Sequence, residues 1–142
     1  MSTKDIISLL LERGNAMQAY WGFYITISFG LIVFFGNAKH SPRTPYLAAL
    51  VTIVFVGFAY VNCGGMVSVS AQRNFLYETL VSFSPSEPLE GKIIEGFSKF
   101  AKPDKPDEVR NFHIASDIAV LIAIWFLTLW KGKKASDVVI RK

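Results

Sequence analysis

His113 and Asp117 are the two side chains in this sequence whose types and spacing are best suited to chemistry. Four residues apart, they fall on one face of a helix, at the start of a long apolar segment. A histidine beside a carboxylate can relay protons or hold a metal ion. In the structural interpretation, the pair only stabilises itself and the first turns of its helix. The sequence favours the structural interpretation and leaves the chemical one open.

Asn62 is the one strongly polar side chain deep within another apolar segment. On a helical wheel it groups with Phe55, Met66 and Arg73, opposite most of the glycines of the same helix. A buried asparagine commonly forms a hydrogen bond between helices, worth roughly 0.5–2 kcal/mol. The alternative is an amide that lines a pore or binds a ligand. We therefore take Asn62, His113 and Asp117 as candidate residues of a polar, pore-lining or proton-handling site.

Other catalytic and metal-binding patterns are missing from the sequence. The histidines His40 and His113 fall on opposite sides of the membrane in the expected topology, which argues against a two-histidine metal or haem site. The single cysteine, Cys63, excludes an internal disulfide and a cysteine cluster within one chain. We therefore expect a protein that is not an enzyme and that holds no cofactor and no metal ion.

The elements that must position these residues are apolar helices. Of the 142 residues, 51% are hydrophobic, which is unusual for a soluble domain of this size. The 25 residues between Arg13 and Lys39 and the 29 between Arg43 and Arg73 carry no charge, and each run exceeds the roughly 20 residues that cross a bilayer. A third segment, residues 114–130, contains only Asp117 as a charge. A soluble fold would leave too little polar surface to cover three such segments.

These segments predict a single all-α membrane domain with three transmembrane helices. We expect the spans at residues 16–36, 46–69 and 112–130, with the second helix continuing to about residue 79. The expected partners are the lipid bilayer and other membrane subunits or copies of the same chain. Nucleic acid is not an expected partner, because the basic residues are few and carry no recognition motif.

Two amphipathic helices are expected outside the spans. Residues 2–13 begin with the capping-box pattern Ser2-Thr3-Lys4-Asp5 and end at Gly14-Asn15, so they predict a helix on the membrane surface. Residues 86–102 lie between prolines and predict a connector helix whose apolar face rests on the bilayer, caps the bundle or docks a partner. Residues 131–142 form a basic tail, in which Lys131, Lys133 and Lys134 are expected to contact lipid headgroups.

Small residues recur on one side of each of the first two spans. Such faces let helix backbones approach closely, so we interpret them as packing surfaces, either within one chain or between chains. The predicted packing residues are Gly22, Thr26, Gly30, Gly57, Gly64 and Ser68.

The distribution of basic residues predicts the orientation. The link with Lys39 and Arg43 and the tail after residue 130 share one side of the membrane, and basic residues favour the cytoplasmic side. We therefore expect a bacterial inner (plasma) membrane protein with a cytoplasmic C-terminus.

The sequence thus favours a non-enzymatic subunit of a larger membrane assembly, either accessory to other proteins or self-assembling. The first alternative is a small homo-oligomeric ion channel or membrane-permeabilising effector, with Asn62 facing the central axis. The second alternative is a proton-handling or metal-dependent membrane enzyme that uses His113 and Asp117.

Overall fold

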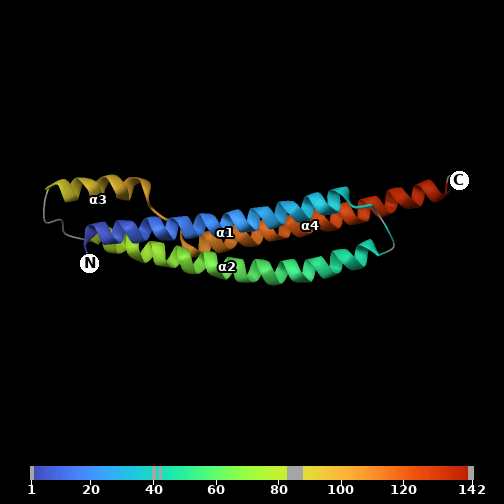
Figure 1. Ribbon diagram of the computed structural model, residues 1–142, viewed down its shortest axis with the longest axis horizontal. Coiled ribbons are helices and arrows are strands. Elements are labelled where there is room, and N and C mark those ends of the chain that lie inside the picture. The colour runs from blue at the N-terminus through green and yellow to red at the C-terminus, as the bar shows by residue number, and fades with distance from the viewer. Residues whose placement is uncertain (1, 40, 42, 83–87, 141–142) are drawn as a thin grey trace. The chain divides into compact units, whose positions relative to one another are not determined.

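The chain folds entirely into helices over the part described. A computed structural model describes residues 2–39, 41, 43–82 and 88–140, with the backbone alone at residues 88, 89, 100 and 131–140. Within these residues it contains four helices: α1 (Thr3–Asn37), α2 (Thr44–Ser82), α3 (Pro88–Phe100) and α4 (Pro106–Ile140) (Figure 1). Helices α1, α2 and α4 are each long and apolar enough to cross a membrane. The predicted all-α class with three candidate spans is confirmed.

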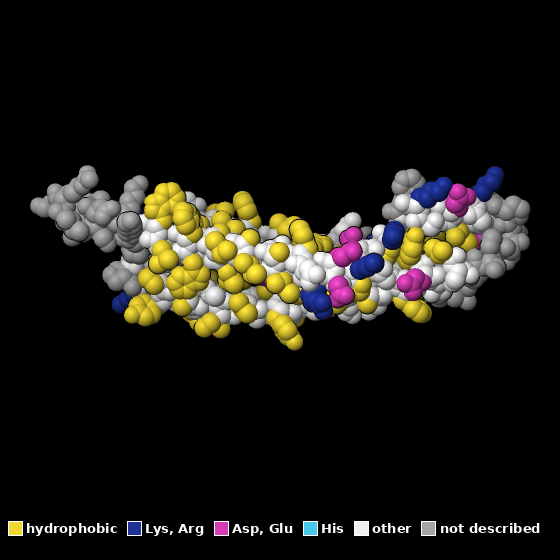
Figure 2. All heavy atoms as spheres, turned by 180° about the vertical axis from the view of Figure 1, so that it is seen from behind, with side chains coloured by type: hydrophobic (Ala, Val, Ile, Leu, Met, Phe, Trp, Pro, Cys, Tyr) yellow, Lys and Arg dark blue, Asp and Glu magenta, His cyan; other side chains and the backbone are white. Residues whose placement is uncertain are grey.

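The three long helices each contribute to two compact units. Unit 1 comprises Met1–Trp21 and Cys63–Phe112, and unit 2 comprises Gly22–Asn62 and His113–Lys142. Within unit 2, the segments of α1, α2 and α4 run side by side (Figure 1). Apolar side chains cover the face of unit 2 that is visible in Figure 2, whereas Lys, Arg, Asp and Glu side chains stand out on unit 1. An apolar exterior of this kind suits contact with lipid.

The connector helix α3 packs against α1 and α2 inside unit 1. Its Ile94 joins Ile6 and Leu10 of α1 and Leu80 of α2 in one buried cluster. The Tyr77 hydroxyl of α2 donates a hydrogen bond to the Ser98 carbonyl of α3 at 3.1 Å. The helix therefore buries part of its apolar face against α1 and α2 within the chain, and whether it also rests on the bilayer, caps the bundle or docks a partner stays a prediction.

The first helix begins as predicted and ends much later. Ser2 N–H donates to the Asp5 carboxylate at 2.8 Å and Asp5 N–H donates to the Ser2 hydroxyl at 3.3 Å, which confirms the capping box. The Ser2 N–H also holds the pKa of Asp5 below its usual value. The predicted helix end at Gly14-Asn15 is wrong, because α1 continues through both residues to Asn37.

The continuity of α1 follows from packing on both sides of Gly14. Leu10 and Met17 are buried within unit 1, and their burial requires the helix to keep its register across the glycine. A glycine inside a helix costs only about 1 kcal/mol relative to alanine, less than burying these two side chains contributes. No described residue of the chain takes a positive φ, so the left-handed helix end that Gly14 suggested does not form.

The other helix bounds lie close to those expected. Helix α2 begins two residues before the predicted start and ends at Ser82, and α3 lies within the predicted connector. Helix α4 starts at Pro106 and continues past Trp130 to Ile140, so the predicted basic tail is helical over its first ten residues. The side chains of Lys131, Lys133 and Lys134 lie outside the described residues.

Candidate functional site

The three polar residues singled out in the sequence meet at one place in unit 2. Asn62 Nδ2 of α2 lies 3.2 Å from His113 Nε2 of α4, and His113 Nδ1 lies 2.9 Å from Asp117 Oδ2. The His113 side chain is fully enclosed, and Asn62 is only 5% exposed. Asp117 keeps 19% of its side chain exposed. A chain of hydrogen bonds therefore crosses from α2 to α4 through one imidazole ring.

The two partners of the His113 ring determine which atoms donate hydrogen bonds when the ring is neutral. The Asp117 carboxylate only accepts, so His113 Nδ1 carries the proton and donates to Oδ2. Nε2 then has a lone pair, and the Asn62 amide N–H donates to it. If the ring gains a second proton, the Asn62 amide must turn to present its oxygen instead. Both ring nitrogens are thus satisfied in either state, at the cost of one side-chain rotation.

Helix α1 closes the site with Tyr24. The Tyr24 ring lies against the His113 ring, with 4.4 Å between their centroids, and it is also buried. Its hydroxyl has Asp117 and Ser28 as polar neighbours. Asp117 Oδ1 and the Ser28 oxygen are buried atoms that make no hydrogen bond with a described residue. All three long helices therefore bring polar atoms to this point.

Regular spacing of buried residues places these side chains. On α2, Phe55, Ala59 and Asn62 follow one another at the spacing of a single helix face, and all are buried. On α4, His113 shares its buried face with Val120 and Ile124. Away from the site, Trp125 Nε1 of α4 donates to the Thr52 hydroxyl of α2 at 3.2 Å. The polar site is therefore one layer of a helix interface that is otherwise mostly apolar.

The site offers proton chemistry more readily than metal chemistry. In the described part of the chain, no group of three or more His, Cys, Asp or Glu side chains is placed to share a metal ion. What the site does contain is an imidazole, a carboxylate and a phenol within a low-dielectric interior, where hydrogen bonds are strengthened and unpaired charges are costly. Such a set can hold a proton or simply join three helices.

The predicted small-residue faces lie away from this site. A Cβ atom added at Gly22, Gly30, Gly57 or Gly64 would meet no described atom within 4 Å. The remaining members of the two faces, Thr26 and Ser68, are also exposed. Within the described chain these residues are not brought together, so whether they pack against another chain stays a prediction.

Gly65, which the sequence did not single out, has a close neighbour. A Cβ atom there would lie 2.7 Å from the Tyr20 ring, well inside van der Waals contact. Both residues belong to unit 1, so α1 and α2 approach closely at this point. The signal available in the sequence was the Gly64-Gly65 pair itself, but it does not reveal which glycine faces α1.

Comparisons with known proteins do not extend this description. The chain matches no protein-family model, no curated protein and no solved structure.

Proposed function

We propose that the chain is a non-enzymatic integral membrane subunit that associates with other membrane subunits or with copies of itself. The supporting observation is the exposure of the six small residues at positions 22, 26, 30, 57, 64 and 68, which no described residue of the chain covers. In a bilayer, lipid tails are as apolar as leucine, so association between helices depends on close backbone approach and dispersion contacts. Exposed glycines on two helices offer that approach to a neighbouring helix.

The Thr26 side chain fits this proposal. Its hydroxyl donates to the Gly22 carbonyl of its own helix at 2.8 Å, so it presents a small, satisfied surface to a neighbour. Large apolar side chains such as Phe29 and Ile53 stand beside the small residues and are more than half exposed. A face that alternates small and large apolar residues provides both the approach and the contact area for a partner helix.

The experiment replaces the exposed glycines Gly57 and Gly64 of α2, which form the glycine face, with a larger residue. We expect the double variant Gly57→Leu, Gly64→Leu to keep its own fold, because a Cβ atom at either glycine has open space around it and leucine favours helix by about 0.8 kcal/mol over glycine. The assembly extracted in mild detergent should fall to a smaller size, read by size-exclusion chromatography with light scattering. Val56→Leu, at an exposed position of the same helix but about a quarter turn away from the glycine face, is the matched control and should leave the size unchanged. An assembly of unchanged size in the double variant would contradict association through this face.

We also propose that the chain lies in a bacterial inner membrane with its C-terminus in the cytoplasm. The support is the basic residues in the link between α1 and α2 and after residue 130. A C-terminal reporter that is active only in the cytoplasm should be active in cells. Activity only of a reporter that requires export would reverse the orientation.

A homo-oligomeric channel is less well supported. The amide of Asn62 is bonded to His113 within the chain, so it is not available to line an axis between copies in this arrangement.

The polar site favours a second candidate function, proton handling in the membrane. The observation behind it is the enclosed His113 ring between the Asn62 amide and the Asp117 carboxylate. Such a ring can take up a proton if Asn62 turns and the carboxylate compensates the charge.

Labelled histidine tests this candidate, because the chain has only two histidines, His40 and His113. NMR of the ¹⁵N-histidine protein in lipid nanodiscs should show two ring signals, and His40→Gln assigns them. Proton handling requires the His113 signal to change protonation state within about pH 5 to 8. A His113 ring that stays in one state throughout, while His40 titrates, would leave the site a purely structural one.

A further inference from the structure

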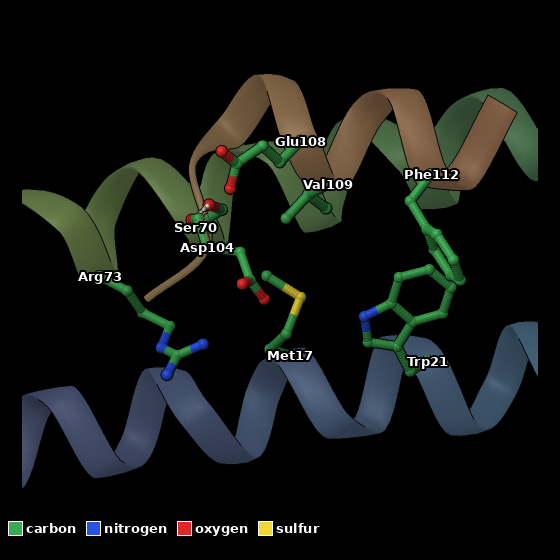
Figure 3. Close-up of a pocket in the computed structure, with 8 residues that line it drawn as sticks. All are labelled: Met17, Trp21, Ser70, Arg73, Asp104, Glu108, Val109 and Phe112. Atoms are coloured by element: carbon green, nitrogen blue, oxygen red, sulfur yellow. Dashed lines mark hydrogen bonds between the residues drawn. The ribbon is translucent and has the colours of Figure 1, made fainter. Parts of the chain in front are cut away.

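Unit 1 contains a cavity that the proposed function does not use. Its volume is about 330 Å³, and it lies between α1, α2 and the start of α4 (Figure 3). Side chains of opposite charge line it together with aromatic and aliphatic ones. The lining residues are Met17, Trp21, Ser70, Arg73, Asp104, Glu108, Val109 and Phe112.

The lining of the cavity is charged at one end and aromatic at the other. Arg73, Asp104 and Glu108 gather toward one end in Figure 3, and the rings of Trp21 and Phe112 form the other. These rings meet edge to face, with 5.5 Å between centroids. Along α1 and α4, Trp21 and Phe112 are also the lining residues nearest in sequence to the apolar segments that follow. An amphiphile would therefore fit with its polar part at the charged end.

Arg73 is a half-buried cation that forms no ion pair with a described residue. Its Nε atom is buried and makes no hydrogen bond with a described residue. The side chain also lines a second cavity, of about 200 Å³, whose other lining residues are uncharged. A guanidinium in such a place favours an anion with two oxygens in one plane, such as a phosphate.

The two carboxylates are held at the cavity by the backbone around them. The Asp104 carbonyl accepts hydrogen bonds from the Ser70 hydroxyl at 2.6 Å and from Asn74 Nδ2 at 2.9 Å, which fixes the segment before α4 on α2. The Asp104 carboxylate itself makes no hydrogen bond with a described side chain or backbone group. Glu108 accepts from the Lys105 N–H at 3.2 Å with one oxygen, which orients it at the first turn of α4.

From this arrangement we propose that the cavity binds the headgroup of a zwitterionic phospholipid, a phosphate linked to an ammonium group. The phosphate lies at Arg73, and the ammonium group lies between Asp104 and Glu108. The glycerol and first acyl carbons lie against Met17, Trp21 and Phe112. One cation and two carboxylates line the cavity, so a simple anion meets net repulsion and a simple cation meets Arg73. A ligand that carries both signs matches both ends.

This inference rests on the proposed function only in that the chain lies in a membrane. Association through the small-residue faces involves other residues, so the two proposals fail separately. A chain that assembles but ignores zwitterionic lipid refutes the cavity proposal alone.

The test measures lipid retained by the purified full-length chain in native mass spectrometry. The probes are phosphatidylethanolamine and phosphatidylglycerol with the same acyl chains. We expect phosphatidylethanolamine to bind at least about tenfold more tightly, and Arg73→Gln to lose about tenfold of that affinity. Arg110→Gln is the matched control, because Arg110 is exposed, pairs with Asp107 at 2.9 Å and lies outside the cavity lining. Equal retention by wild type and Arg73→Gln would overturn the proposal.

A second variant guards against loss of folding as the explanation. Asp104→Asn with Glu108→Gln leaves Arg73 as the only charge in the cavity lining, so the preference should reverse toward phosphatidylglycerol. Adding Arg73→Gln to this variant should abolish the new preference, because a general attraction of the basic chain for anionic lipid would persist without Arg73. An unchanged preference in this variant would also overturn the proposal.

A soluble headgroup tests whether the ligand is a membrane lipid or a free zwitterion with the same phosphate and ammonium groups. Glycerophosphoethanolamine has the same phosphate and ammonium groups without acyl chains. We expect it to displace the lipid only at far higher concentration, since it lacks the contacts at Trp21 and Phe112. Displacement at equal concentration would overturn the lipid assignment in favour of a soluble zwitterion.

Discussion

The two units of this molecule differ in whether their polar side chains bond to one another or face a cavity. In unit 2, Asn62, His113 and Asp117 face one another, and both ring nitrogens of the histidine are bonded within the chain. In unit 1, Arg73 and Asp104 face a cavity and leave charged groups without a partner among the described residues. A polar layer whose central ring is bonded on both nitrogens specifies how helices pack, whereas charged groups that face a cavity are suited to bind something from outside.

The difference implies opposite consequences for stability. Removing a side chain that is hydrogen-bonded to two buried partners leaves those partners unsatisfied in a low-dielectric interior, so it destabilises the fold. Removing a cation that forms no ion pair relieves a desolvation cost, so it leaves the fold unchanged or more stable. The following predictions run from the largest expected effect to the smallest.

Truncation of His113 should destabilise the chain most. His113→Ala removes a fully buried ring, breaks both hydrogen bonds and leaves Asn62 and Asp117 without that partner, for an expected loss of about 3–5 kcal/mol. Reversible denaturation in mixed detergent micelles, followed by circular dichroism, measures it. Ile114→Ala, at the exposed neighbouring position, should change stability by less than about 0.5 kcal/mol. Similar losses in both variants would remove the distinction between the two regions.

The adjacent glycines of α2 should respond differently to a methyl group. Gly65→Ala forces the Tyr20 ring to move, whereas Gly64→Ala meets no described atom and gains helix propensity. We expect Gly64→Ala to be the more stable of the two by about 1–2 kcal/mol, measured in the same denaturation assay. Equal stabilities would mean that α1 and α2 do not approach closely at Gly65.

The hydrogen bond between Asn62 of α2 and His113 of α4 should give the two residues a measurable interaction energy. A double-mutant cycle with Asn62→Leu and His113→Leu should give an interaction energy of about 0.5–1.5 kcal/mol. The pair Thr52→Val with His113→Leu provides the reference, since Thr52 bonds to Trp125 instead. Coupling as strong in the reference pair would show that the cycle reports general destabilisation.

Replacing Arg73 should change stability least. Arg73→Met keeps a side chain of similar length and removes a charge that has no ion pair in the described chain, so lipid-free protein should lose less than about 0.5 kcal/mol or gain stability. The comparison is with His113→Ala under the same conditions. A loss of several kcal/mol would show that Arg73 has a stabilising partner within the fold.

The sequence was sufficient for the parts of the fold that depend on composition and spacing. Long apolar runs predicted the three long helices, and the Ser2 to Asp5 pattern predicted the capping box. It failed at Gly14, where local propensity favoured a helix end and tertiary burial of Leu10 and Met17 prevailed. Local preferences do not include contacts with residues distant in the sequence.

The site was predictable to a similar extent. The spacing of His113 and Asp117 predicted their contact, and the isolated polarity of Asn62 predicted a bond between helices without naming its partner. The place of Tyr24 in the site could not be predicted, because nothing in the neighbouring sequence indicates that it faces α4. The cavity was missed altogether, since Arg73 and Asp104 are 31 positions apart and only the fold brings them together.

The most direct test of the central claim, that this chain is a subunit of a membrane assembly, is its mass after gentle extraction from its own membrane. Native mass spectrometry should find a defined assembly heavier than the 15.8 kDa of one chain, made of several copies or of this chain with other polypeptides. A single chain of 15.8 kDa, recovered alone in every mild detergent that keeps it folded, would contradict the claim.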